Sequence, residues 1–200
     1  MVDSLIEWDV AQLTLPGEEQ SGDCYWVKPF GTSVLVVVID GLGHGDPAAA
    51  AAKIAVEALE ANVRDSVISL FRRTHEALRQ SRGAVMSMAL IHGADATMTW
   101  MGVGNVEGLL VRASPDIKPR RESLLIRPGL LGGPLPPLDA SVTPIRPGDT
   151  LVFATDGIHS GFDQAVNLRE SPKEIAANIM SKFSKDSDDA LVLVARYVGI

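Results

Sequence analysis

Hydrophobic and polar residues alternate at the start of the chain in the pattern of β-strands. The alternation over residues 6–10 predicts a strand with one buried face. Two apolar segments, 24–28 and 33–39, flank a glycine and predict a hairpin. Residues 35–39 form an unbroken, largely β-branched run, which is typical of a strand that is covered on both faces.

The period then changes to that of helices and back again. Residues 48–62, which are rich in alanine, and residues 66–80 contain neither glycine nor proline, so both segments predict helices. The small side chains of the first predicted helix, residues 48–62, would let this helix lie close against a sheet. Residues 84–91, 97–103 and 106–112 have the pattern of strands. Their short connections predict antiparallel pairing.

The second half of the chain is interrupted by proline. Eight of the 12 prolines lie between residues 115 and 147, so this stretch is expected to be mostly surface loop, with a short strand at 124–126. Apolar strands are predicted at 150–155 and 190–197. Between them, the sequence Ser-Pro-Lys-Glu from residue 171 is a capping box that opens a helix to about residue 183.

This order of elements predicts an α+β fold. Antiparallel strands dominate, one helix pair is inserted near the front, and one helix lies near the end, without the β-α-β alternation of a parallel sheet. The helices are therefore expected on the outside of antiparallel sheets. Neither a repeat nor a linker divides the chain, so residues 1–200 are expected to form a single domain.

Charge and composition narrow the functional classes. The net charge is −7, from 18 basic and 25 acidic residues, and the basic residues are scattered, which disfavours nucleic-acid binding. The single cysteine, Cys24, excludes an internal disulfide, and the N-terminal residues lack the pattern of a signal peptide. No apolar run approaches the ~20 residues of a membrane helix. We therefore expect a cytoplasmic protein that binds neither membrane nor nucleic acid, with a monomer as the expected state.

Three groups of carboxylates stand at predicted strand ends. Asp40 and Asp156 each follow an apolar strand directly and each precede a glycine, while Asp188 and Asp189 directly precede the last strand. If the last strand is antiparallel to the other two, all these side chains crowd one edge of a sheet. Like charges so close are costly unless a cation is present, and Mg²⁺ or Mn²⁺ prefers such oxygen ligands. The alternative is that each Asp-Gly pair is simply a turn.

Several short motifs, taken in order, give the chain a family resemblance. Together they resemble the motif series of the PP2C-type (PPM) metal-dependent serine/threonine phosphatases, in particular the bacterial branch that includes SpoIIE and RsbU. The resemblance covers roughly residues 20 to 197, and it is specific as a set. The motifs are Gly22-Asp23, Val37-Val38-Ile39-Asp40-Gly41-Leu42-Gly43-His44-Gly45, Gly102-Val103-Gly104-Asn105, Leu151-Val152-Phe153-Ala154-Thr155-Asp156-Gly157 and Asp188-Asp189.

The resemblance implies an αββα sandwich of two mostly antiparallel sheets flanked by helices, with two ions, Mn²⁺ or Mg²⁺, at one end. Asp40 would bridge both ions, the Gly41 carbonyl would bind one of them, and Asp156 and Asp188 would complete the other. Asp23 would contact an ion directly or through water. A shift of one residue in the last motif would exchange Asp188 for Asp189. Two ions about 4 Å apart can activate a bridging water for attack on a phosphate.

The sequence departs from the family at two places. The larger eukaryotic members carry a phosphate-binding arginine near the first motif, and none precedes Asp23 here. Asn105 stands where many relatives have aspartate, which argues against a third ion.

Histidine and cysteine offer further candidate chemistry. His44, four residues after Asp40, is a candidate general acid for the leaving serine or threonine oxygen, or alternatively a turn residue that bonds the backbone. Cys24 is not expected to be a nucleophile, because Phe30 stands where cysteine phosphatases need arginine.

By resemblance the chain is expected to be a phosphatase of phosphoserine or phosphothreonine. The implied substrates are phosphorylated STAS-domain scaffold proteins of a stress-signalling complex. Two alternatives remain open at this point. One is a non-catalytic interaction module with the same fold, and the other is a metal-dependent phosphatase of small molecules.

Overall fold

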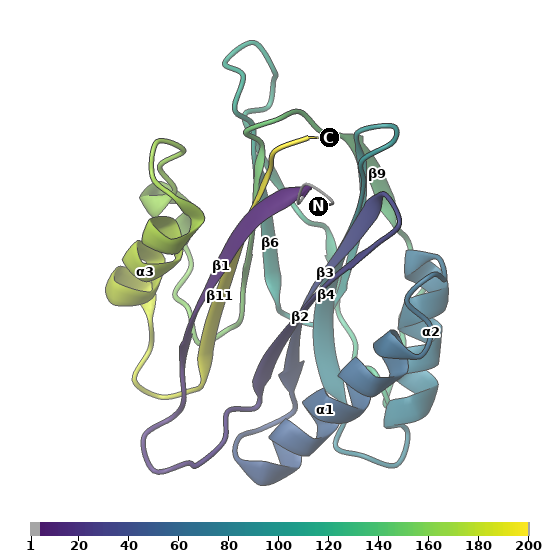
Figure 1. Ribbon diagram of the computed structural model, residues 1–200. Helices are drawn as coiled ribbons and strands as arrows, with labels where there is room; N and C mark the ends of the chain where they lie inside the picture. Colours follow the sequence, from purple (N-terminus) through teal and green to yellow (C-terminus); the bar gives the residue numbers. More distant parts are fainter. Residues whose placement is uncertain (1–4, 200) are drawn as a thin grey trace.

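Two β-sheets pack face to face in the computed structural model, which describes residues 5–199, and helices cover both outer faces (Figure 1). The five-stranded sheet has the order β1 (Ile6–Leu13), β11 (Ala190–Tyr197), β10 (Thr150–Ala154), β6 (Glu107–Val111) and β7 (Arg121–Ser123). The six-stranded sheet has the order β2 (Asp23–Phe30), β3 (Ser33–Gly41), β4 (Ala84–His92), β5 (Thr97–Val103) and β8 (Ile126–Arg127), and β9 (Ser141–Pro144) also pairs with β5. All pairs are antiparallel except β5 with β8, so the predicted sandwich is confirmed.

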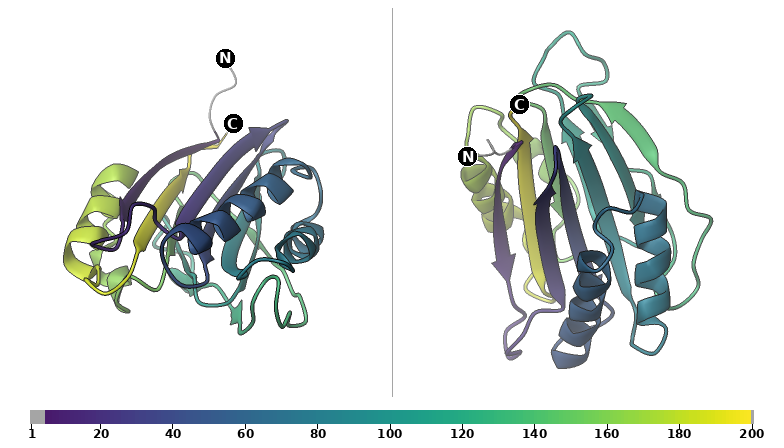
Figure 2. Two further views of the ribbon diagram at one scale, coloured as in Figure 1. Left: turned by 90° about the horizontal axis from the view of Figure 1, so that it is seen from below. Right: turned by 45° about the vertical axis from the view of Figure 1, so that its right-hand side comes forward.

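The helices divide between the two sheets, as Figure 2 shows. The helices α1 (Asp46–Glu60) and α2 (Val67–Leu78) pack on the six-stranded sheet, and α3 (Pro172–Phe183) packs on β1 and β11. A short 3₁₀ turn, η1 (Phe162–Ala165), precedes α3. The capping box predicted at Ser171 is present, with hydrogen bonds in both directions between Ser171 and Glu174. Within residues 5–199 no helix is long and apolar enough to span a membrane.

The position of strand β3 between the helices and the other sheet explains why its sequence is an unbroken apolar run. Leu35, Val37 and Ile39 pack against α1 and α2, whereas the alternate residues Val34, Val36 and Val38 face the other sheet. The strand is therefore covered on both faces, as predicted. The buried alanines of α1 let the helix approach the sheet closely, which brings its backbone against the end of β3.

The prediction of a strand at 124–126 is wrong, because the chain passes from one sheet to the other there. Strand β7 pairs with β6 in one sheet, and β8 pairs with β5 in the other. Leu124, between them, is buried where the two sheets meet, against Gly102 of β5 and Gly108 of β6. A Cβ atom on Gly108 would lie 2.8 Å from Leu124 Cβ, and one on Gly102 would lie 2.6 Å from Ser87 Oγ and 3.0 Å from Leu124 Cδ2. The crossing therefore favours small residues on both sheets.

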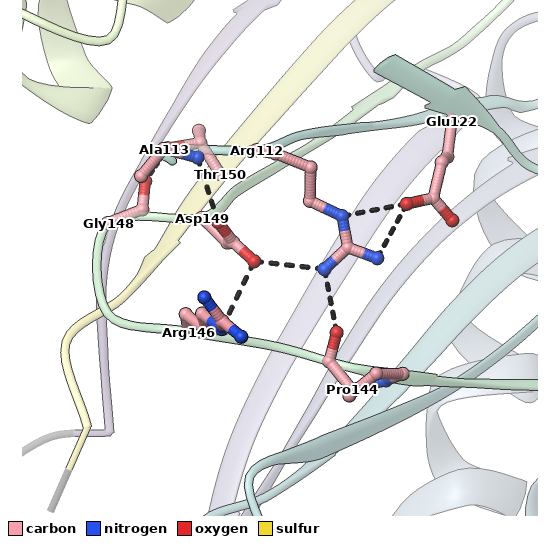
Figure 3. Close-up of polar contacts among 8 residues, drawn as sticks. All are labelled: Arg112, Ala113, Glu122, Pro144, Arg146, Gly148, Asp149 and Thr150. Atoms are coloured by element: carbon pink, nitrogen blue, oxygen red, sulfur yellow. Dashed lines mark hydrogen bonds and ion pairs between the residues drawn. The ribbon is translucent and has the colours of Figure 1, made fainter. Parts of the chain in front are cut away.

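A buried ionic network closes the proline-rich segment onto the end of β6 (Figure 3). The Arg112 guanidinium is 4% exposed and lies between two carboxylates, with Nη1 3.0 Å from Asp149 Oδ2 and Nε 2.7 Å from Glu122 Oε1. It also donates to the Pro144 carbonyl at 2.6 Å. Asp149, 1% exposed, accepts further hydrogen bonds from the backbone N–H groups of Ala113 and Arg146. The network thus joins the end of β6 to strand β7 and to residues 144–149.

Candidate functional site

The ends of β2 and β3 bring two carboxylates together in the six-stranded sheet. Asp23 and Asp40 are directly opposite in the register of this antiparallel pair. Side chains at such positions lie on the same face of the sheet, and like charges there repel each other. Asp23 is buried and Asp40 is half-buried. The β-hairpin therefore holds two acidic groups where burial and repulsion both disfavour ionisation.

The five-stranded sheet supplies the remaining carboxylates at the same end of the sandwich. Asp156 follows β10, and Asp188 and Asp189 precede β11. Because β10 and β11 are antiparallel, the end of one lies beside the start of the other. The expectation of a single sheet edge is wrong, since β3 belongs to the other sheet. The acidic residues instead meet between the two sheets, where Asp40 of one sheet and Asp156 and Asp188 of the other line one cleft.

Hydrogen bonds fix most of these side chains. Thr155 donates from Oγ1 to Asp23 Oδ2 at 2.7 Å, which links the two sheets. Asn105 donates from Nδ2 to Asp156 Oδ2 at 2.8 Å, and Lys185 Nζ donates to the Asp156 carbonyl at 2.5 Å. The Asp40 carboxylate makes no hydrogen bond or ion pair with any residue from 5 to 199.

Asp188 and Asp189 have different environments. Both carboxylate oxygens of Asp189 accept backbone N–H groups, from Leu15 at 2.8 Å and from Gly22 at 2.7 Å, and the residue is 3% exposed. Asp189 therefore ties the β1–β2 connection to the start of β11. Asp188 instead lines a cleft of about 180 Å³ together with Asp40 and Asp156. The cleft is also lined by Leu42, Gly43, His44, Val85, Asn105 and Ser187.

The carboxylates perturb one another. Burial, followed by the charges of the neighbouring carboxylates, raises the pKa of Asp40 from 3.8 to about 8. Burial also raises the pKa of Asp23 to about 7, although the hydrogen bond from Thr155 opposes the shift. The pKa of Asp156 is raised as well, first by burial and then by Asp188. Protons or cations must therefore neutralise this cluster.

The chemistry of this donor set fits a hard divalent cation, which takes carboxylate and carbonyl oxygens as ligands. In the described chain the Asp40 carboxylate has neither a hydrogen-bond donor nor a cationic partner. It shares its cleft with the carboxylates of Asp156 and Asp188. Within residues 5–199, however, no three His, Cys, Asp or Glu side chains already stand in the arrangement of a metal site. The carboxylates are close enough to raise one another's pKa, but an ion would have to draw them together.

The raised pKa values predict how the metal-free protein responds to pH. Below about pH 4 these carboxyl groups are mostly neutral in both folded and unfolded chains, so their ionisation does not change the free energy of unfolding. As pH rises from about 4 to 8, the unfolded chain ionises first, so the free energy of unfolding falls. We expect a lower Tm in EDTA at pH 8.5 than at pH 5, and a smaller drop for Asp40→Asn.

Thermal melts of both proteins across this pH range check the prediction. Asp139→Asn is the control, because that exposed carboxylate pairs with Arg127 at 3.3 Å and does not line the acidic cleft. A Tm in EDTA that rises with pH would contradict the prediction that the raised pKa values of these carboxyl groups lower stability. An equal drop in Tm for wild type and Asp40→Asn would contradict it as well.

Glycines follow both strand-end aspartates for steric reasons. A Cβ atom on Gly41 would lie 2.1 Å from the Ala48 carbonyl oxygen of α1. On Gly157, it would lie 1.9 Å from the Asp189 carbonyl oxygen. The close approach is to backbone in both cases, which has no freedom to move aside.

His44 lies at the rim of the acidic cleft with a defined partner. Its Nδ1 is 2.5 Å from Glu18 Oε1, and its side chain is 60% exposed. Because a carboxylate only accepts, Nδ1 carries the proton and Nε2 is free to serve a substrate. One alternative for His44 is a turn residue whose side chain bonds the backbone. The His44 side chain bonds Glu18 instead, so that hydrogen bond is not observed.

Comparisons with known proteins place the chain in a family. A family model described as stage II sporulation protein E (SpoIIE) matches residues 31–198. The chain belongs to the SpoIIE family. Phosphoserine phosphatase RsbX of Bacillus subtilis (strain 168) is 24% identical to it in a 190-residue alignment that covers 94% of this chain and 92% of RsbX.

Solved structures agree with this family. A structure from work on the bacterial stressosome superposes with a TM-score of 0.87 and 29% identity, covering 96% of this chain and 99% of its own. RsbX in complex with magnesium gives a TM-score of 0.86 at 23% identity, with 96% of this chain and 95% of RsbX covered. The PP2C phosphatase domain of SpoIIE from Bacillus subtilis, solved with a fragment of the regulatory domain, gives a TM-score of 0.76 at 18% identity. The match covers 96% of this chain and 62% of that chain. The expected family, fold and PP2C-type phosphatase class are confirmed.

Sequence reasoning missed the residues that hold the acidic side chains in place. Thr155 directly precedes Asp156 but serves Asp23 on the other sheet, and Glu18 lies in the connection between β1 and β2. Asn105 was noted only as a departure from the family. A polar residue at a strand end beside an acidic motif could have indicated Thr155, whereas no pattern indicates Glu18.

Proposed function

We propose that this chain, as one catalytic domain over residues 1–200, hydrolyses phosphoserine or phosphothreonine on a protein with the aid of divalent ions. The observation that carries the proposal is the meeting of Asp23, Asp40, Asp156 and Asp188 from four strand ends of two sheets, with the pKa of Asp40 raised to about 8. Four acidic groups so close together repel one another unless protons or cations neutralise them. Two ions, Mn²⁺ or Mg²⁺, would neutralise phosphate charge and activate water for in-line attack.

We propose a role for each oxygen donor. Asp40, which borders the carboxylates of both sheets, is proposed as the ligand shared by two ions. Gly41 would offer its carbonyl, and Asp156 and Asp188 would complete one ion. Asp23 would hold an ion directly or through water with the oxygen that Thr155 leaves free. Asp188 is preferred to Asp189, whose two oxygens are both occupied by backbone N–H groups.

His44 is proposed as the general acid: as an imidazolium it would give its Nε2 proton to the leaving oxygen, while Nδ1–H stays bonded to Glu18. We expect His44→Ala to lower kcat by about 10²-fold on a phosphoserine peptide. The loss should be much smaller on p-nitrophenyl phosphate, because p-nitrophenolate leaves readily without a proton. Rates on both substrates in saturating Mn²⁺ test this, with Glu18→Gln expected to show a weaker form of the same pattern. Equal losses on the two substrates would assign His44 to positioning.

Turnover of p-nitrophenyl phosphate and of a phosphoserine peptide, with and without Mn²⁺, tests the proposed function. Metal-dependent hydrolysis of both supports it. Binding of Mn²⁺ without any turnover would instead indicate a non-catalytic module. A strong preference for phosphorylated metabolites over the peptide would indicate a small-molecule phosphatase.

The proposed substrates are phosphorylated STAS-domain scaffold proteins of a stressosome. Similarity to phosphoserine phosphatase RsbX and to a structure from work on the bacterial stressosome supports this choice. A cytoplasmic monomer would suit such a role. Dephosphorylation of a purified phosphorylated scaffold protein, followed by mass spectrometry, tests the substrate.

A further inference from the structure

A cleft of about 290 Å³ lies beside the end of β6, away from the acidic cluster. Three arginines and no carboxylate line it, although the net charge of the chain is −7. The lining residues are Val111, Arg120, Arg121, Val166, Asn167, Leu168 and Arg169. Positive charge is thus concentrated in one hollow of an acidic protein.

The walls of this arginine cleft are held by hydrogen bonds. The Arg120 carbonyl accepts the Arg112 N–H at 2.9 Å, which anchors one wall to the buried ionic network. On the other wall, Arg196 Nη2 donates to the Glu170 carbonyl at 2.6 Å. Val111 and Val166 are buried beneath the cleft. The cleft is therefore formed before any partner arrives.

Two of the three guanidinium groups are available to a partner. Arg121 lies 3.9 Å from Asp163 and also donates to its carbonyl at 3.2 Å. Among the described residues, Arg120 and Arg169 are exposed and their side chains have no hydrogen bond or ion pair. Exposed guanidinium groups form paired hydrogen bonds with carboxylates when an acidic segment approaches.

A second cleft adjoins the arginine cleft and extends along β6 toward the acidic cleft. This cleft, of about 420 Å³, shares Arg121 with the arginine cleft and extends to Glu107. Glu107 is two residues from Asn105, which lines the acidic cleft. At ~3.3 Å per residue, Val111 and Asn105 are at most about 20 Å apart. This second cleft contains Glu107 and Asp163, so only its end at Arg121 favours an acidic ligand.

We propose that the arginine cleft docks an acidic segment of the phosphoprotein substrate while its phosphoserine occupies the acidic cleft. The substrate part of this inference rests on the proposed function. Complementary charge at a site remote from the reaction would raise the affinity for the correct partner. Nucleic acid fits less well, since no aromatic side chain lines the cleft for base stacking.

Binding of a fluorescein-labelled hexaglutamate peptide tests the docking site without any turnover. We expect Arg120→Glu/Arg169→Glu to weaken binding by about tenfold at low salt. The control is Arg72→Glu on α2 together with Arg79→Glu directly after it, which changes the net charge equally and should bind like wild type. Equal affinity of wild type and the cleft variant would overturn the proposal. It would also be overturned by an equal loss in the control, or by tighter wild-type binding of an oligothymidylate of the same charge.

Kinetics connect docking to catalysis. One phosphoserine peptide carries six glutamates beyond a ten-residue flexible spacer, long enough for about 20 Å, and its partner carries six glutamines. We expect about tenfold lower wild-type KM for the glutamate peptide with equal kcat, and no difference in the cleft variant. Equal KM values for wild type would overturn the link to the substrate. Absence of turnover on every peptide would count against the proposed function, whereas hexaglutamate binding would still report the docking site.

Discussion

Replacing Asp40 with asparagine is expected to lower kcat by roughly 10³-fold or more while the protein stays folded. Metal assistance contributes several kcal/mol to a phosphoryl transfer, and each 1.36 kcal/mol is a factor of ten. Asp40 is the carboxylate proposed to be shared by both ions. Its side chain has no hydrogen bond to lose in the described structure, and burial already disfavours its charge. The loss should therefore appear in turnover rather than in folding.

The measurement is kcat on p-nitrophenyl phosphate in saturating Mn²⁺, together with Tm in EDTA. Asp139→Asn, an exposed carboxylate in an ion pair, should retain full activity. Asp189→Asn should behave differently, with a clear loss of Tm, because Asp189 holds two backbone N–H groups. Near-normal turnover by Asp40→Asn would be hard to reconcile with a shared ligand.

Removing the guanidinium in Arg112→Ala is expected to cost about 3–5 kcal/mol of unfolding free energy. The variant would leave Asp149 buried with an uncompensated charge and would release the Pro144 carbonyl (Figure 3). The network lies at the end of β6 away from Asn105, so kcat should change little where the variant is folded.

Urea denaturation of wild type and variant gives this free energy. Arg127→Ala is the matched control, because its ion pair with Asp139 is exposed and should contribute about 1 kcal/mol or less. If Arg112→Ala cost no more than this control, the buried pair would have no special role in stability. The double variant Arg112→Met/Asp149→Asn should recover part of the loss, since it removes both charges and keeps an oxygen to accept the Ala113 N–H.

Most of the fold could be predicted because its strands have strong patterns. The last strand, Ala190–Tyr197, matches its predicted bounds, and β3 has the continuous apolar run of a strand covered on both faces. The crossing at Leu124 could not be predicted, because Leu124 is apolar for contacts with both sheets rather than for a place in one strand. Alternation shows that a residue is buried without showing which sheet it belongs to.

The same limitation applies to the site. Asp40 and Asp156 could be found because each interrupts an apolar run at its end, and a following glycine marks a change of direction. That they belong to different sheets is set by pairing between distant strands, which no local pattern contains. The preference for Asp188 over Asp189 depends on two backbone N–H groups from the β1–β2 connection, and these are likewise invisible in the sequence.

The glycines after the two aspartates also bear on how this site could be lost in evolution. Gly41 and Gly157 are needed by the architecture, since any side chain there would collide with the main chain of α1 or of the segment before β11. The aspartates before them are needed by the chemistry proposed for the site. A descendant that survived only as a scaffold would therefore be free to discard its acids, yet would still inherit both glycines.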